Sequence, residues 1–194
     1  MRVSKSSCIL SVIIVNYKVK SELLGCLESI VNSLKKVAFE VIVVENDEET
    51  DLTDELKKYK FVTYVRAKKN LGFGGGNNLG AKHVSGKFLF FLNPDTKIEK
   101  GDLKDILSRF DDSKIGIVAP LLLDSNKKPY EKQGTMRLTP LTAAFSLSFI
   151  YKYFPNNSIA NKFWLKDWDK KNILEVDVVP GTAFLIKKKL FNSI

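Results

Sequence analysis

The sequence predicts an α/β fold with a mostly parallel, Rossmann-like central sheet, flanking helices and a less regular C-terminal half. Short apolar runs rich in β-branched residues alternate closely with segments whose apolar residues repeat at helical spacing. Such alternation indicates βαβ units with right-handed crossovers. A length of 194 residues with 44% hydrophobic content is also sufficient for one domain with its own core.

The first half of the chain carries the clearest elements. Residues 8–15 form an apolar, β-branched run and are expected to be a buried strand. Ser21 can cap the next helix, whose apolar positions are Leu23, Leu24, Leu27, Ile30, Val31 and Leu34. Further strands are expected at 39–44, 61–65, 87–92 and 115–119, helices at 52–59, 77–85 and 102–110, and a glycine loop at 72–76.

After Pro120 the pattern becomes irregular. We expect a polar turn at 124–129, an edge strand at 130–138, an amphipathic helix at 141–153, and strands at 176–179 and 183–187. No internal repeat or linker divides the sequence. We therefore predict a single domain over 1–194, with a regular half at 1–119 and an irregular half at 120–194.

Charge and cysteine content narrow the possible partners. The net charge of +9 suits nucleic acid, anionic lipid or a phosphate-bearing ligand. Because the lysines are scattered and no nucleic-acid-binding motif accompanies them, we expect no nucleic-acid partner. Cys8 and Cys26 lack metal-ligand spacing and suit a reducing cytoplasm, and the single His83 cannot build a histidine-based zinc site.

The sequence gives no sign of a leader or a membrane span. The apolar stretch near the N-terminus is short, ends in Asn16 and has no small-residue cleavage pattern, so we expect a strand and not a signal peptide. No run approaches the about 18 apolar residues of a spanning helix. Residues 141–153 combine aromatic residues with Lys152, as interfacial helices do, and packing within the protein is the alternative.

Polar segments come directly after four consecutive predicted strands: Asn16-Tyr17, Glu45-Asn46-Asp47, the glycine-rich segment 70–78 and Asn93-Pro94-Asp95. In a parallel sheet these segments emerge at the same edge. The Asn-Pro-Asp ending offers a carboxylate and an amide to a divalent cation shared with phosphates, and an ordinary turn is the alternative. The glycine segment fits neither the dinucleotide pattern nor the P-loop, but its backbone can approach a diphosphate closely.

With these motifs in this order, the chain resembles a family 2 glycosyltransferase of the GT-A fold. The similarity is to the rhamnosyltransferase-like branch, which builds bacterial surface polysaccharides. It lies in residues 11–17, 43–46, 70–80 and 92–96, with a weaker match at 179–186. The resemblance implies an inverting transferase that moves a sugar from a nucleoside-diphosphate donor to a glycan or lipid-linked acceptor. It also implies a divalent cation, Mg²⁺ or Mn²⁺, and donor binding by residues 1–119 with the acceptor side at 120–194.

The resemblance assigns roles to individual residues. Tyr17 would stack on the base, Glu45 would accept the imide N–H of the base, and Asp95 would bind the metal with Asn93 beside it. The alternative for Tyr17 is packing at the sheet edge, and the alternative for Glu45 is a solvated turn. For Asn70 it is hydrogen bonding to the loop backbone. The implied nucleotide-sugar contacts are Asn16, Tyr17, Glu45, Asn46, Asn70, Gly72, Asn77, Asn93 and Asp95. The implied contacts of the donor sugar and acceptor are Gly181, Thr182 and Ala183.

The chain departs from the family pattern at three places. Asn77 stands where many relatives have arginine, and Asn93 replaces a carboxylate. The acidic motif expected to supply the catalytic base would come after Ile194, so the chain looks truncated and the base is unassigned. Asp167, Asp169, Glu175 and Asp177 are the carboxylates of the second half, and surface roles suit them better. A nucleotide-sugar-binding module without transferase activity is therefore the alternative function. We expect either protein to be cytoplasmic, with a peripheral position at the inner face of the membrane.

Overall fold

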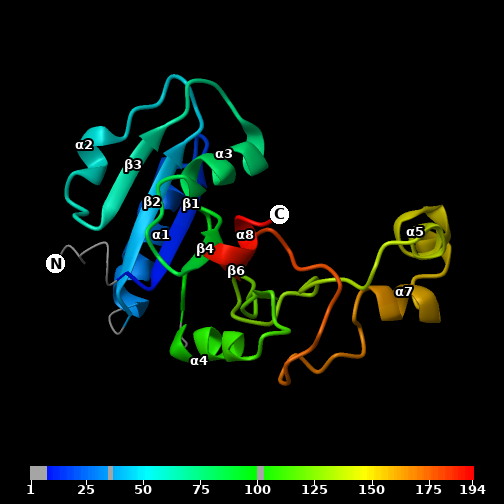
Figure 1. Ribbon diagram of the computed structural model, residues 1–194. Helices are drawn as coiled ribbons and strands as arrows, with labels where there is room; N and C mark the ends of the chain where they lie inside the picture. Colours follow the sequence, from blue (N-terminus) through cyan, green and yellow to red (C-terminus); the bar gives the residue numbers. More distant parts are fainter. Residues whose placement is uncertain (1–7, 35–36, 100–102) are drawn as a thin grey trace. The chain divides into compact units, whose positions relative to one another are not determined.

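The computed structural model describes residues 8–34, 37–99 and 103–194, which group into two compact units (Figure 1). The sheet unit takes the chain up to Val118 and again from Gly181 to Ile194, and the second unit is 119–180. Residues 1–7, which we expect not to belong to a signal peptide, and the predicted helix start at Asp102 lie outside the described residues. The assignment of the whole chain to one domain stays a prediction.

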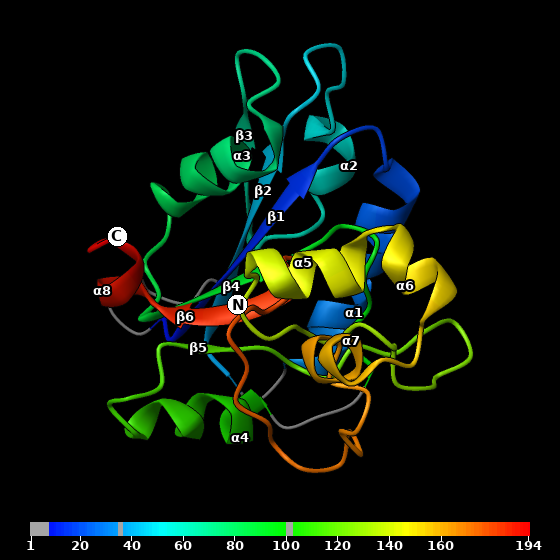
Figure 2. The ribbon, with the colours of Figure 1, turned by 90° about the vertical axis from the view of Figure 1, so that its right-hand side faces the viewer.

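The sheet unit is built on one six-stranded sheet in the order β3-β2-β1-β4-β6-β5 (Figure 2). Its strands are β1 (Leu10–Asn16), β2 (Phe39–Glu45), β3 (Val62–Arg66), β4 (Phe88–Leu92), β5 (Ile117–Val118) and β6 (Ala183–Lys187). β1 pairs in parallel with β2 and β4, and β2 in parallel with β3. β6 runs antiparallel to both β4 and β5. The predicted mostly parallel sheet is confirmed.

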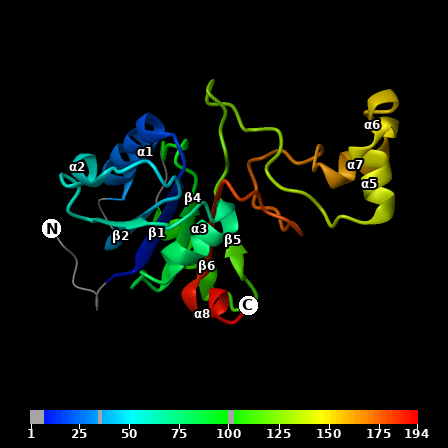
Figure 3. The same cartoon turned by 90° about the horizontal axis from the view of Figure 1, so that it is seen from above.

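Helices cover both faces of this sheet, with α1 on one side and α3 on the other (Figures 2 and 3). The sheet unit holds α1 (Lys20–Ser33), α2 (Thr53–Leu56), α3 (Gly72–Ala81), α4 (Leu103–Ser108), the 3₁₀ turn η2 (Arg109–Asp111) and α8 (Lys188–Phe191). The predicted cap at Ser21 is wrong. α1 begins one residue earlier, after Val19, and the Ser21 hydroxyl donates to the Glu22 carboxylate at 2.6 Å.

The predicted glycine loop at 72–76 is also wrong, because these residues form the first turns of α3. Glycine is a poor helix former, so propensity alone favours a loop. Packing reverses that preference. A Cβ at Gly76 would lie 2.7 Å from Val15 Cγ1, and one at Gly80 would lie 2.6 Å from Ile13 Cγ2. The glycines therefore let α3 lie directly on β1.

The core of the sheet unit lies between β1, β2, β4 and β6. Ile13, Ile42, Leu89 and Phe91 are buried in one cluster with Ile186 and neighbouring apolar residues. The Phe91 ring stacks on Phe184 with centroids 4.8 Å apart. Because these strands are buried on both faces, their ends are held firmly, and side chains carried there have little freedom.

The second unit contains α5 (Pro140–Leu147), α6 (Phe149–Tyr153) and α7 (Ser158–Phe163). The predicted helix at 141–153 is interrupted at Ser148, whose Oγ accepts the Ile150 N–H at 3.1 Å and caps α6. The predicted strands at 130–138 and 176–179 are wrong. Across residues 119–180 the structure has only two isolated β-bridges, Leu123 with Pro129 and Thr135 with Val178.

The buried side chain of Gln133 explains the missing edge strand. Its Oε1 accepts the Leu122 N–H at 2.8 Å, and its Nε2 donates to the carbonyl groups of Leu122 and Tyr130. A side-chain amide thus takes backbone partners that a strand ladder would use. None of the helices in the described part of the chain is long and apolar enough to cross a bilayer.

Candidate functional site

The predicted polar residues of β1 and β2 meet at the carboxyl ends of these strands. Asn16 and Glu45 are register partners, and Asn16 Nδ2 donates to Glu45 Oε2 at 2.7 Å. The Asn46 N–H donates to the Asn16 carbonyl at 2.8 Å, which continues the pairing one residue past the strands. The structure therefore brings these three residues together, as the parallel pattern predicts.

Glu45 is completely buried, and both of its carboxylate oxygens have partners within the protein. Besides Asn16, the Asp47 N–H donates to Glu45 Oε1 at 3.0 Å. Burial raises the pKa of Glu45, and the two hydrogen bonds oppose that shift. The Asn16 side chain is also fully buried, and its Oδ1 has no hydrogen-bond partner among the described residues. A base could reach the Glu45 carboxylate only if one of these partners moved.

Asn46 connects the end of β2 to the start of α3. Its Oδ1 accepts the Leu71 N–H at 2.9 Å, and its Nδ2 donates to Asn70 Oδ1 at 3.0 Å and to the Gly72 carbonyl at 3.3 Å. Asn70 Oδ1 accepts a second hydrogen bond, from the Gly72 N–H at 2.8 Å. Gly72 has φ +67°, which favours glycine at this turn.

The side chains of α3 near this end differ in exposure. Asn77 is buried, and its Nδ2 donates to the Phe73 carbonyl of its own helix at 3.1 Å. Phe73, by contrast, is 53% exposed. A Cβ on Gly181 would lie 3.4 Å from Phe73 Cε1, so this ring lies against the segment that leads into β6. Sequence reasoning missed Phe73, although a bulky aromatic residue flanked by glycines was a usable signal.

Tyr17 comes directly after β1 and is 46% exposed, so its ring is available to a ligand. Lys18 Nζ lies 5.4 Å from the centre of this ring and 3.7 Å from a carboxylate oxygen of Asp47. Lys18 adopts φ 59°, an uncommon value for a residue with a side chain. The exposed ring and its neighbouring cation thus sit beside the buried pair of Asn16 and Glu45.

The turn after β4 lies next to the start of β6. The Asn93 N–H donates to the Thr182 carbonyl at 2.9 Å, and Leu92 is the register partner of Ala183. Thr96 closes the turn by donating its N–H and hydroxyl to the Asn93 carbonyl. Asp95 is exposed at the tip of this turn. The structure therefore brings residues 181–183 together with the Asn-Pro-Asp segment.

The donor set for a metal is small. No cluster of three or more His, Cys, Asp or Glu side chains is found among the described residues. Asp95 supplies one carboxylate, and the half-buried Asn93 can add an amide oxygen. Such a pair fits Mg²⁺ or Mn²⁺ only if phosphate oxygens and water complete the shell, because both ions need about six ligands. Nearby Cys26 is no ligand candidate, since burial raises the pKa of its thiol to about 12.

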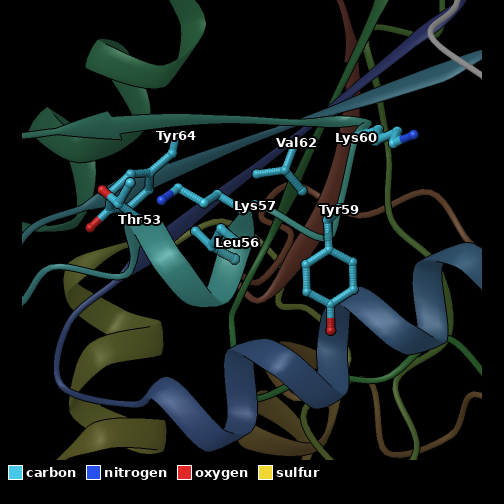
Figure 4. Close-up of a pocket in the computed structure, with 7 residues that line it drawn as sticks. All are labelled: Thr53, Leu56, Lys57, Tyr59, Lys60, Val62 and Tyr64. Atoms are coloured by element: carbon cyan, nitrogen blue, oxygen red, sulfur yellow. The ribbon is translucent and has the colours of Figure 1, made fainter.

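A separate pocket of about 500 Å³ lies beside the edge strand β3 and the short helix α2 (Figure 4). It is lined by Thr53, Leu56, Lys57, Tyr59, Lys60, Val62 and Tyr64, none of which is a predicted site residue. The Tyr64 hydroxyl accepts the Leu52 N–H at 3.0 Å, and Lys57 pairs with Asp54 at 2.7 Å. These internal contacts give the pocket a structural explanation, and we assign it no ligand.

Comparisons with known proteins find related sequences and a shared fold. The sequence model of a family described as glycosyl transferase family 2 matches residues 11–193. The low-salt glycan biosynthesis hexosyltransferase Agl10 of Haloferax volcanii is 24% identical over 189 residues, which cover 95% of this chain and 54% of Agl10. The minor teichoic acid biosynthesis protein GgaB of Bacillus subtilis is 32% identical over 118 residues, which cover 56% of this chain and 13% of GgaB. The chain thus spans about half the length of Agl10, or less for GgaB.

Solved structures share the fold. Residues 1–349 of TarS from S. aureus superpose with a TM-score of 0.53 at 19% identity, covering 81% of this chain and 54% of that one. The same TarS segment in complex with UDP gives a TM-score of 0.52, also at 19% identity, covering 76% and 49%. At such low identity the likeness concerns the fold.

Proposed function

The chain belongs to glycosyl transferase family 2, and on this premise we propose that it transfers a hexosyl group, such as rhamnosyl, with inversion at the anomeric carbon. The donor is a nucleoside-diphosphate sugar, and the acceptor is a glycan or a lipid-linked precursor of a surface polysaccharide. Relatives named for glycan and teichoic acid biosynthesis support this assignment. The observation that carries it is the convergence of four polar segments at one end of the sheet.

That convergence rests on a continuous series of contacts within the sheet unit. Asn16 bonds Glu45, and Asn46 bonds the start of α3. Phe73 of α3 lies against Gly181, and Thr182 bonds the Asn93 turn. In open α/β sheets ligands bind beyond the carboxyl ends of the strands, which is where these segments lie.

Each segment has its own part in donor binding. The exposed Tyr17 ring stacks on the base. Glu45 supports this site by accepting hydrogen bonds from the Asn16 side chain and the Asp47 backbone. The glycine-rich start of α3 approaches the diphosphate, where Gly74 leaves open space in place of a side chain. Asp95 and Asn93 would hold Mg²⁺ or Mn²⁺ together with phosphate oxygens. When bound, that ion stabilises the charge on the leaving nucleoside diphosphate. Gly181, Thr182 and Ala183 would lie beside the donor sugar and the acceptor, with Ala183 itself buried.

No residue is assigned as the general base that inversion requires. Asp169 accepts the N–H groups of Lys171 and Asn172, which lower its pKa, and Asp177 accepts the Arg137 N–H at 2.7 Å. Asp169 therefore stabilises a turn, and Asp177 holds the segment at Arg137, both within the second unit. A nucleotide-sugar-binding module without transferase activity is the second candidate, because no residue is assigned as the catalytic base.

Calorimetry of the chain against a panel of nucleoside diphosphates with Mn²⁺ tests the donor site. We expect one nucleotide to bind in a metal-dependent way, and we expect Asp95→Ala to abolish that binding while leaving the fold intact. Asp105→Ala is the control, because Asp105 is an exposed carboxylate on α4. If Asp95→Ala binds as well as the parent does, the metal role is wrong. Release of nucleoside diphosphate from the sugar nucleotide with an added acceptor then separates a transferase from a binding module.

We also propose a cytoplasmic position with peripheral contact to the inner face of the membrane. Residues 132–166 contain five Lys or Arg and no Asp or Glu. The same stretch exposes Phe149 and Tyr153 of α6, at 74% and 72%, and Leu147 of α5 at 56%. Exposed aromatic residues among cations favour an anionic lipid interface, where a lipid-linked acceptor would be found.

A further inference from the structure

We propose that Asn46 is a positioning residue, which fixes the start of α3 against β2, and that Asn70 Oδ1 serves as its hydrogen-bond acceptor and not as a nucleotide contact. This inference deepens the proposed function and rests on it for the identity of the ligand. Both residues belong to the motifs expected to touch the nucleotide sugar, so the proposal reassigns them.

Both N–H donors of the Asn46 side chain and one lone pair of its oxygen are used inside the protein. A side-chain amide has two N–H donors and one carbonyl oxygen. Asn46 gives its donors to Asn70 Oδ1 and the Gly72 carbonyl, and its Oδ1 accepts the Leu71 N–H. The residue is only 3% exposed. No donor of Asn46 is left for a ligand, and we call these three hydrogen bonds the Asn46 clamp.

Asn70 uses only its oxygen in these contacts. Asn70 Oδ1 accepts both Asn46 Nδ2 at 3.0 Å and the Gly72 N–H at 2.8 Å. A carboxylate oxygen can accept the same two hydrogen bonds. An aspartate at position 70 therefore preserves the contacts of the asparagine, whereas an aspartate at position 46 does not.

The Asn46 clamp matters because of the residues next to it on α3. Residues 70–72 are tied to β2, and Phe73 and Gly74 are the next two residues of the helix. Phe73 lies against Gly181, and a Cβ on Gly74 would have no heavy atom within 4 Å. Fixing Gly72 thus fixes both the exposed ring and the open backbone beside it. A preformed position of this kind lowers the entropy cost of binding a ligand.

The test compares Asn46→Asp with Asn70→Asp. Each variant adds one carboxylate to the same contact, so repulsion of a diphosphate affects both. Asn46→Asp removes both donors and turns an oxygen toward Asn70 Oδ1 and the Gly72 carbonyl. Rotation of the Asn70 amide can repair one of these contacts, but it deprives the Gly72 N–H of its acceptor. Asn70→Asp keeps every acceptor in place.

Amide hydrogen exchange and nucleotide affinity measure the difference between Asn46→Asp and Asn70→Asp. Amide hydrogen exchange of Leu71 and Gly72, whose N–H groups donate to Asn46 Oδ1 and Asn70 Oδ1, is expected to be about tenfold faster in Asn46→Asp than in the parent and unchanged in Asn70→Asp. A tenfold change corresponds to about 1.4 kcal/mol. UDP with Mn²⁺ is the binding probe, and we expect its affinity to be about tenfold lower in Asn46→Asp than in Asn70→Asp. Amides of β1 and β2 are the internal reference for global folding.

The outcomes are distinct. Equal exchange at Leu71 and Gly72 in both variants and the parent overturns the Asn46 clamp, and so does a loss of UDP affinity in Asn70→Asp as large as in Asn46→Asp. If Asn46→Asp exposes the β1 and β2 amides as well, Asn46→Ala, which removes the clamp without adding charge, replaces it in the same comparison. If the parent binds no nucleoside diphosphate, the proposed function fails, and the exchange data still decide the clamp.

Discussion

Different kinds of interaction stabilise the inside of the sheet unit and the inside of the second unit. In the sheet unit, strand ladders pair the backbone, and the strands bury continuous apolar runs. In residues 119–180, single side chains such as Gln133 and Asp169 take up the backbone groups, and large apolar residues stay exposed. A repeating interaction leaves a repeating pattern in the sequence, whereas a single side-chain contact does not.

Substitution of glycines in α3 tests whether close packing holds the sheet unit together. Gly80→Ala places a Cβ 2.6 Å from Ile13 Cγ2 and 3.1 Å from Val44 Cγ2. Because both neighbours are buried and β-branched, we expect a loss of about 3 kcal/mol in the free energy of unfolding. Gly74→Ala is the matched control in the same helix. It meets open space and should gain up to about 1 kcal/mol from helix propensity. Urea unfolding followed by circular dichroism measures both, and equal losses would contradict the packing argument.

The same packing explains what the sequence could and could not predict. Strands of the parallel sheet were predictable to within about two residues, because buried parallel strands are nearly continuous apolar runs. The convergence of Asn16, Glu45 and Asn93 was predictable from parallel direction alone. The helical state of 72–76 was not, since glycine propensity opposes it and only contact with β1 favours it. The internal bonding of Asn46 and Asn70 was equally hidden, because an amide that binds the backbone and one that binds a ligand look identical in sequence.

Substitution of Glu45 tests how much its buried hydrogen bond with Asn16 stabilises the sheet unit. Glu45→Ala leaves the buried Asn16 amide without its partner, and we expect a loss of about 2 kcal/mol in the free energy of unfolding. Glu45→Gln should cost less, because its amide N–H groups can donate to Asn16 Oδ1, which lacks a partner among the described residues. Urea unfolding at pH 7 separates the two variants, and equal losses would show that an amide at position 45 does not restore the hydrogen bond with Asn16.

The raised pKa of Glu45 also predicts a pH dependence. The folded state favours the protonated carboxyl, so its contribution to stability is complete below the ordinary Glu pKa of about 4.3 and is lost as pH rises through the raised folded pKa. Glu45→Gln cannot ionise and should lose less stability than the parent between pH 4 and pH 7. A constant difference between parent and variant over this range would contradict the buried, pKa-raised carboxyl.

The cap of α5 tests whether the second unit opens independently. The Thr139 hydroxyl accepts the Thr142 N–H, and Thr142 Oγ1 accepts the Thr139 N–H, so the pair forms a capping box. Thr139→Ala should cost about 1 kcal/mol, seen as faster amide exchange in α5. Amides of β1 and β2 should be unaffected. Faster exchange in α5 and also in β1 and β2 would contradict independent opening, because it would mean that the two units unfold together.

Substitution of the exposed aromatic residues of α6 should change the stability least and should strongly weaken lipid binding. Phe149→Ser and Tyr153→Ser, made together, should change the free energy of unfolding by less than about 0.5 kcal/mol, because both side chains are mostly exposed. If the exposed surface of α6 meets anionic lipid, the same variant should no longer float with vesicles that contain phosphatidylglycerol, whereas the parent floats at low salt and less at high salt.

Ile173→Ser provides the matched control for this last experiment. Ile173 is 74% exposed, as Phe149 is, and it belongs to the same unit. Residues 167–177 around it contain four Asp or Glu and two Lys, a net charge of −2, whereas Phe149 lies in the stretch 132–166 that has no acidic residue. Loss of an equally exposed apolar side chain from an acidic segment should leave flotation unchanged, since anionic lipid repels that segment. Flotation that falls equally in both variants would indicate unspecific apolar binding, and a parent that does not float would refute the membrane contact.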